Sequence, residues 1–201
     1  MKPVCLVLGA GAGIGGTVAA KFASEGYHSY LCRRSDQEGL DKLIKGIEDA
    51  GGSASGSLLN AIEEDVLEEI ITKVESDVGP IEVLVYNLGA QTGMKLLSQT
   101  THKEFEWGWR MASFGLFRAA KVLCPIMAER GKGTFLVTSA TAAMRGNATQ
   151  HSHAAAMGAR RMLCQSLNAE FAPKGIHVAH IVVDGAVDAP DTLGKMLGPE
   201  M

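Results

Sequence analysis

Short apolar runs alternate along the chain with longer segments in which apolar residues recur every three or four positions. Residues 4–8 form an unbroken apolar run that stops at a glycine cluster, which is typical of a strand buried on both faces of a parallel sheet. Similar or weaker runs predict further strands at residues 29–32, 53–59, 83–86, 134–138 and 176–183.

Helical periodicity fills the gaps between these strands. It predicts helices over residues 17–24, from residue 36 to the glycine pair at 51–52, and over residues 62–78, 103–129 and 153–171. We expect the helix over 103–129 to be interrupted near Gly115 and by Pro125.

This regular alternation implies a doubly wound α/β fold of the Rossmann type, with three layers and a parallel sheet in the order 3-2-1-4-5-6. Residues 1–201 are expected to form one domain whose shortened tail, about 188–201, holds no seventh strand.

The loop after the first strand is rich in glycine. Glycine permits a tight turn and a close approach to a pyrophosphate, and the following helix N-terminus offers free N–H groups to phosphate. Two registers fit, Gly11-Gly13-Gly16 and Gly9-Gly13-Gly15, and the strand end at Leu8 favours the second. We expect dinucleotide contacts from Gly9, Gly11, Ala12, Gly13, Ile14 and Gly15, with a purely structural turn as the alternative.

The second predicted strand ends at Arg33 and Arg34. An acidic residue there would accept hydrogen bonds from the 2′-hydroxyl of NAD, whereas guanidinium groups suit a 2′-phosphate. We therefore expect NADP(H) as cofactor in preference to NAD(H), unless both arginines are simply solvated.

Composition narrows the possible functions. A chain of 201 residues that is 46% hydrophobic, 20% charged and of net charge −3 suits a folded domain and argues against a nucleic-acid binder. No run approaches the length of unbroken apolar sequence that spans a membrane, so no membrane partner is expected. The four cysteines have no metal-ligand spacing, which favours reduced thiols in a cytoplasmic protein without a metal site.

The glycine loop, the arginine pair and the segment Tyr86-Asn87-Leu88-Gly89 together resemble the short-chain dehydrogenase/reductase family, over residues 3–189. The segment over 170–178 also looks like the one before that family's sixth strand. The resemblance implies cofactor contacts from Asn87, Leu88 and Gly89, and from Asn60, where the family has an aspartate near the adenine. It also implies a homodimer or homotetramer.

The chain departs from the family where the catalytic residues lie. That family uses a tyrosine as proton donor, a lysine four residues later, a serine and an asparagine. By resemblance these positions fall on His153, Met157, Ala140 (with Ser139 beside it) and Ala112, and no YxxxK sequence is present.

A histidine has an ordinary pKa near 6.5, so His153 can move a proton near neutrality, with Ser139 anchoring the substrate oxygen. The alternatives are that His153 has only a packing or surface role, or that the alignment is shifted. Met157 is expected to pack.

Several other residues are weaker candidates. Thr138 and Thr141 lie where strands of such sheets bind ligands, and Trp107 and Trp109 are expected in the core or an interface. Arg160 and Arg161 are expected to face solvent or a partner subunit.

Two functions remain. The first is an NADP(H)-dependent oxidoreductase that moves a hydride between nicotinamide and a carbonyl or alcohol, with degenerate catalytic residues. The second is a non-catalytic NADP(H)-binding sensor or scaffold.

Overall fold

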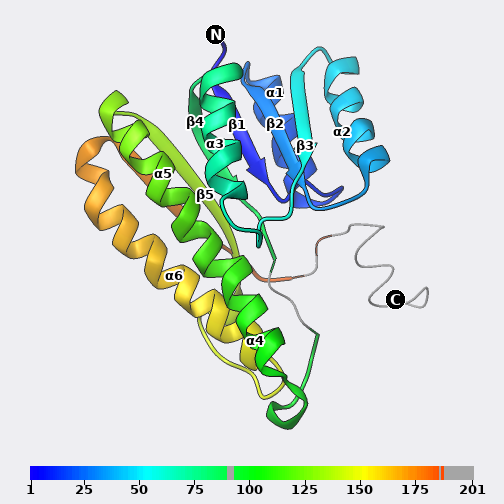
Figure 1. Cartoon of the computed structure of the whole chain (residues 1–201), viewed down its shortest axis with the longest axis vertical. Coiled ribbons are helices and arrows are strands. Elements are labelled where there is room, and N and C mark those ends of the chain that lie inside the picture. Colours follow the sequence, from blue (N-terminus) through cyan, green and yellow to red (C-terminus); the bar gives the residue numbers. More distant parts are fainter. Residues whose placement is uncertain (90–92, 186, 188–201) are drawn as a thin grey trace.

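A single parallel sheet organises the computed structural model, which describes residues 1–89, 93–185 and 187 (Figure 1). Its six strands lie in the order β3-β2-β1-β4-β5-β6, so the predicted fold class and strand order are confirmed. The strands are β1 (Val4–Leu8), β2 (His28–Arg33), β3 (Ser53–Leu58), β4 (Ile81–Tyr86), β5 (Gly133–Ala140) and β6 (Ile176–Val183). The predicted tail over 188–201 lies outside the described residues.

Helices cover the two faces of this sheet. Side chains on a strand alternate between faces, and in β1 Cys5 and Val7 pack with the helices α1 (Ile14–Ser24) and α2 (Gln37–Asp49). Leu6 and Leu8 point the other way, into a cluster with α3 (Val66–Asp77), α5 (Gly115–Arg130) and α6 (His151–Phe171). The strand therefore needs apolar residues at every position, which explains its unbroken apolar run.

The helical region predicted over 103–129 has an irregular centre. It begins as α4 (His102–Trp109), passes through a π-helical segment, η2 (Arg110–Phe114), and continues as α5. The interruption predicted near Gly115 therefore lies just before it. The interruption predicted at Pro125 is wrong, because Pro125 lies inside α5. It sits on the exposed side of the helix, where water can bind the carbonyl group that a proline leaves free.

The helix predicted from residue 62 begins later, at Val66. Asp65 precedes it with a left-handed backbone, at φ 60°. The short 3-10 segments are η1 (Leu97–Gln99), η3 (Thr141–Ala143) and η4 (Ala172–Lys174).

The stretch His102–Arg130 is long and apolar enough to cross a membrane by length and composition alone. However, 56% of its most apolar window is buried inside the domain. Its buried face belongs to the same core as β1 and β4, which is the position of a core helix in a sheet layer.

Candidate active site

The glycine loop is built by close approaches between backbone segments. Gly9 has φ 98°, and a Cβ there would lie 2.7 Å from the carbonyl oxygen of Asn87. A Cβ on Gly15 would lie 2.2 Å from the carbonyl oxygen of Gly9, and one on Gly16 would lie 2.6 Å from that of Gly11. Such distances exclude side chains, so the loop needs glycine at positions of both predicted registers.

Gly11 differs from these glycines. A Cβ there would meet nothing within 4 Å, because it would point into open space. The open space above Gly11 belongs to a cavity of about 310 Å³, which we call the first cavity. It is lined by Gly9, Gly11, Arg33, Arg34, Ser35, Asn87, Leu88, Gly89, Trp107 and Met111. The fold thus brings the glycine loop, the arginine pair and the segment after β4 to one hollow.

The two arginines of this cavity are not equivalent. The guanidinium group of Arg33 forms an ion pair of 2.8 Å with Asp36, which also accepts a hydrogen bond of 2.9 Å from the Gly39 amide. Arg34 is exposed beside it. Part of the Arg33 charge is therefore already balanced, whereas Arg34 offers its charge to the cavity mouth.

Asn87 ties three strand ends together. Its side-chain amide donates to the carbonyl oxygen of Gly9 at 2.9 Å, and its side-chain oxygen accepts from the Thr138 hydroxyl at 2.7 Å. The ends of β1, β4 and β5 are consequently held at fixed spacing under the cavity.

Five other predicted cofactor residues do not line this cavity, namely Ala12, Gly13, Ile14, Gly15 and Asn60. The side-chain oxygen of Asn60 is buried without a hydrogen-bond partner, while its amide donates to Glu63 at 3.0 Å. An acceptor left in this state fits a ligand that carries a donor, such as the amino group of an adenine.

A second cavity of about 150 Å³ adjoins the first and shares Asn87, Leu88 and Gly89 with it. Its other lining residues are Ile14, Thr138, Ser139, Ala140, His153, Met157, Arg160 and Val183. The predicted pair His153 and Ser139 therefore meets in one pocket at the carboxyl end of β5, where such sheets bind ligands. The buried Ser139 hydroxyl donates to the Met157 sulfur at 3.6 Å.

Arg160 was predicted to face solvent or a partner subunit, and that prediction is wrong. The residue is 1% exposed, and its guanidinium group donates to three backbone carbonyls: Ala112 at 2.9 Å, Thr138 at 2.6 Å and Leu88 at 2.6 Å. It also lies over the ring of Tyr86, 5.2 Å from the centroid. Burial lowers the pKa of Arg160, but a guanidinium group remains protonated in proteins.

A sequence signal for this placement exists. Arg160 follows His153 by seven positions and Met157 by three, so helical periodicity puts all three on one face of α6. Arg161, one position on, is only half-buried.

The π-helical segment supplies two of the carbonyls that organise this region. The carbonyl of Ala112 accepts from Arg160, and that of Met111 accepts from the Tyr86 hydroxyl at 2.6 Å. A π-helical turn leaves its carbonyls short of regular helical partners, so both hydrogen bonds satisfy groups that the irregular backbone exposes. Tyr86 is fully buried, which raises the pKa of its hydroxyl, and it lines neither cavity.

The two tryptophans lie in different environments. Trp107 lines the first cavity and packs against the core, while Trp109 is 43% exposed and stacks on Phe114.

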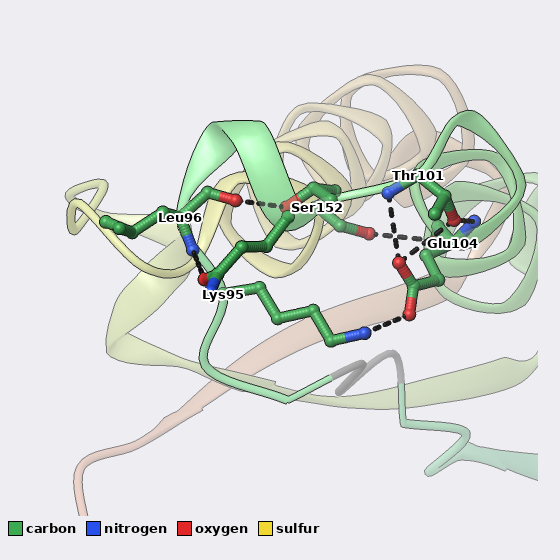
Figure 2. Close-up of polar contacts among 7 residues, drawn as sticks. Lys95, Leu96, Thr101, Glu104 and Ser152 are labelled. Atoms are coloured by element: carbon green, nitrogen blue, oxygen red, sulfur yellow. Dashed lines mark hydrogen bonds and ion pairs between the residues drawn. The ribbon is translucent and has the colours of Figure 1, made fainter.

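A polar cluster that the sequence reasoning missed lies beside His153. Figure 2 shows the Lys95 ammonium group on the Glu104 carboxylate, which also accepts from the Thr101 backbone and hydroxyl. Ser152, next to His153 on α6, donates to the Glu104 carbonyl at 3.1 Å. The hydrogen bond with Lys95, and then those with Thr101, lower the pKa of Glu104 to about 2. The cluster fastens the segment before α4 to the first turn of α6.

Comparison with known proteins agrees with this geometry. The family model described as short chain dehydrogenase matches residues 3–194. The 3-oxoacyl-[acyl-carrier-protein] reductase FabG of Thermotoga maritima is 29% identical over 189 residues, which cover 94% of this chain and 76% of that protein. The short-chain reductase protein NovJ of Streptomyces niveus is 32% identical over 200 residues, which cover 98% and 74%.

Solved structures are similar as well. A short-chain dehydrogenase from Rhodopseudomonas palustris superposes with a TM-score of 0.85 at 33% identity, covering 90% of this chain and 84% of that one. A gluconate 5-dehydrogenase from Burkholderia cenocepacia, in complex with NADP and tartrate, gives a TM-score of 0.82 at 26% identity, covering 90% and 71%. The shared sheet order and the match along nearly the whole sequence lead to one conclusion: the chain belongs to the short-chain dehydrogenase family.

Proposed function

We propose that this protein is an NADP(H)-dependent oxidoreductase acting on a carbonyl or an alcohol, with His153 as proton donor and Ser139 as anchor of the substrate oxygen. The observation that carries the proposal is the junction of the two cavities at Asn87, Leu88 and Gly89. An elongated dinucleotide that occupies the first cavity has its redox end directed toward the second, where His153 and Ser139 lie.

The chain's residues fit the cofactor at three points. The first cavity combines open space above Gly11 with the arginine pair, which suits a diphosphate and a 2′-phosphate. The unpartnered oxygen of Asn60 suits an adenine amino group. The presence of NADP in the structure of the gluconate 5-dehydrogenase supports the same cofactor here.

The reaction then divides between cofactor and protein. The bound nicotinamide supplies or accepts a hydride at the substrate carbon. In the reducing direction His153 gives a proton to the substrate oxygen, and in the oxidising direction it takes that proton. The Ser139 hydroxyl turns from the Met157 sulfur, which is a weak acceptor, to the substrate oxygen, which is a stronger one.

A second candidate function rests on Met157. A thioether cannot hold the nicotinamide ribose by a charged hydrogen bond. The Met157 sulfur also accepts the hydrogen bond of the Ser139 hydroxyl, which the first function needs for the substrate oxygen. A protein that binds NADP(H) as a sensor or scaffold, without turnover, would tolerate this arrangement.

A titration followed by one turnover separates the two functions. The purified protein is titrated with NADPH and NADH by calorimetry, and the NADPH complex is then mixed with a panel of ketones and aldehydes while absorbance at the nicotinamide band is followed. Tighter binding of NADPH and its oxidation by at least one carbonyl are expected. Binding without oxidation would favour the sensor, and no binding of either nucleotide would contradict both functions.

The proposal extends to the oligomeric state and the cellular location of the protein. Large apolar side chains are exposed on α4, α5 and α6, namely Phe105, Trp109, Phe117 and Met162, which supports a homodimer or homotetramer formed through these helices. The four cysteines are free and buried, which supports a cytoplasmic location.

A further inference from the structure

The guanidinium group of Arg160 is a buried charge without an opposite charge. Its partners are three carbonyl oxygens and the Tyr86 ring, and the described part of the chain places no carboxylate within ion-pair distance of it. Carbonyl dipoles satisfy its hydrogen bonds but leave its net charge intact.

Such a charge is costly to keep. Removing a cation from water is unfavourable unless dipoles or a counter-ion replace the lost hydration, and an apolar side chain in the same place would avoid that cost. The neighbouring Arg161 shows that the helix carries an arginine at lower cost one position away. A buried cation in a pocket wall is therefore a candidate for function.

The charge also lies where it acts on a ligand. Arg160 lines the second cavity with His153 and Met157. The rest of the wall combines apolar residues such as Leu88 and Val183 with polar ones such as Asn87, Thr138 and Ser139. Arg160 is 1% exposed, and a charge that water does not reach is screened weakly, so its field extends into the adjoining cavity of about 150 Å³.

We propose that Arg160 is the fixed positive charge of the second cavity and that it makes the protein bind the reduced cofactor in preference to the oxidised one. This inference rests on the proposed function, since it needs the nicotinamide end of NADP(H) in that cavity. The reduced nicotinamide ring is uncharged and the oxidised ring carries one positive charge, so only the oxidised form is repelled.

The consequence concerns how the cofactor is loaded and released. When a carbonyl is reduced, the protein takes up NADPH readily and releases NADP⁺ readily. In that reaction a hydride, with its two electrons, leaves NADPH for the carbonyl carbon, and His153 supplies the proton that completes the alcohol.

The test compares two dissociation constants. NADPH and NADP⁺ carry the same phosphates and the same adenine, so the ratio of the NADP⁺ constant to the NADPH constant isolates the charge of the ring. We expect the native protein to bind NADPH more tightly, and Arg160→Met to lower the ratio by about fivefold. Arg160→Lys should keep most of the preference, and Arg161→Met, which removes a charge from the same helix outside the cavity, should leave the ratio unchanged.

The outcomes separate this inference from the function on which it rests. Equal affinity of the native protein for the two forms, or an unchanged ratio in Arg160→Met, overturns the role of Arg160 and leaves NADP(H) binding intact. No binding of either form overturns both. If thermal melting shows that Arg160→Met is unfolded, the native ratio still tests the proposal, because a preference for NADPH of less than about threefold overturns it.

Discussion

The two cavities share Asn87, Leu88 and Gly89, yet the rest of their walls differ in kind. One side of the first cavity is glycine backbone, where missing side chains let segments touch, and the rest of its own wall is formed by Arg33, Arg34, Ser35, Trp107 and Met111. The second is shaped by side chains, and there His153 and Met157 stand where the family resemblance places a tyrosine and a lysine.

This contrast shows how tightly the residues around each cavity are constrained. Where a Cβ would lie 2.2 Å from a carbonyl oxygen, as at Gly15, no other residue fits and the glycine must stay. A wall of side chains can exchange one polar group for another and keep the fold. Arg160 limits this freedom, because its side chain holds carbonyls of three different segments.

The largest effect is expected from Gly15→Ala, in the glycine loop that contributes to the first cavity. The added methyl group would collide with the backbone at Gly9, so the loop must move or the start of α1 must shift. We expect a loss of more than about 2 kcal/mol in the free energy of unfolding and no measurable NADPH binding. Urea denaturation and calorimetry give the two values.

The matched control is Gly11→Ala, in the same loop. Its methyl group meets no protein atom within 4 Å, so stability should stay within about 0.5 kcal/mol of the native value. NADPH affinity should still fall at least about tenfold, because the methyl group occupies the space proposed for the diphosphate. Native affinity in Gly11→Ala would place the nucleotide elsewhere.

His153→Ala tests the second cavity. Removing the imidazole leaves no other group of ordinary pKa near neutrality among the residues lining the second cavity. Turnover should therefore fall at least about tenfold with little change in NADPH affinity. The control is His151→Ala, on the same helix but outside both cavities. Equal turnover in the native protein and His153→Ala would clear His153 of a catalytic role.

A smaller effect should come from the arginine pair. Arg34→Ala and Arg33→Ala are each expected to weaken NADPH binding by about three- to tenfold. The affinity for NADH, which has no 2′-phosphate, should stay unchanged. The effect of Arg34→Ala should be the larger, because Asp36 already balances part of the Arg33 charge. If the preference for NADPH over NADH survives in both variants, the arginines do not select the cofactor.

Much of the fold follows from local signals in the sequence. The strand runs and the glycine loop are local patterns, and the regular alternation of strands and helices adds the strand order. The place of Asn87, Leu88 and Gly89 in the first cavity was expected from the family resemblance alone. The helix through Pro125 could not, since its continuity depends on which side of the helix meets solvent.

The second cavity was only partly predictable. The family resemblance points to His153 and Ser139, but the burial of Arg160 depends on carbonyls contributed by three segments that are distant in sequence. One of these carbonyls is available because the backbone is π-helical at Ala112, and no simple sequence pattern announces such a turn. The Lys95–Glu104 pair was not predicted for a similar reason. It becomes a candidate for a role near the site only because Glu104 contacts α6 through Ser152, which is distant in sequence.

The smallest expected effect concerns this polar cluster, which reaches Ser152, the residue next to His153. The pKa of Glu104 is about 2, below its ordinary value of 4.5, so the folded state favours the ionised carboxylate. The resulting stabilisation is complete above pH 4.5 and is lost as the pH falls toward 2. Glu104→Gln should therefore lower the melting temperature at pH 7, and the difference from the native protein should shrink over that acidic range.

Glu106→Gln is the control for this variant, because Glu106 lies on the same helix but has a mostly exposed side chain and a longer ion pair of 3.5 Å with Arg110. Its effect on the melting temperature should be smaller and nearly independent of pH. If Glu104→Gln also slows turnover at pH 7 while Glu106→Gln does not, the cluster positions the first turn of α6, and with it His153. If neither variant changes turnover, the cluster stabilises the fold alone and does not position the side chains of the second cavity.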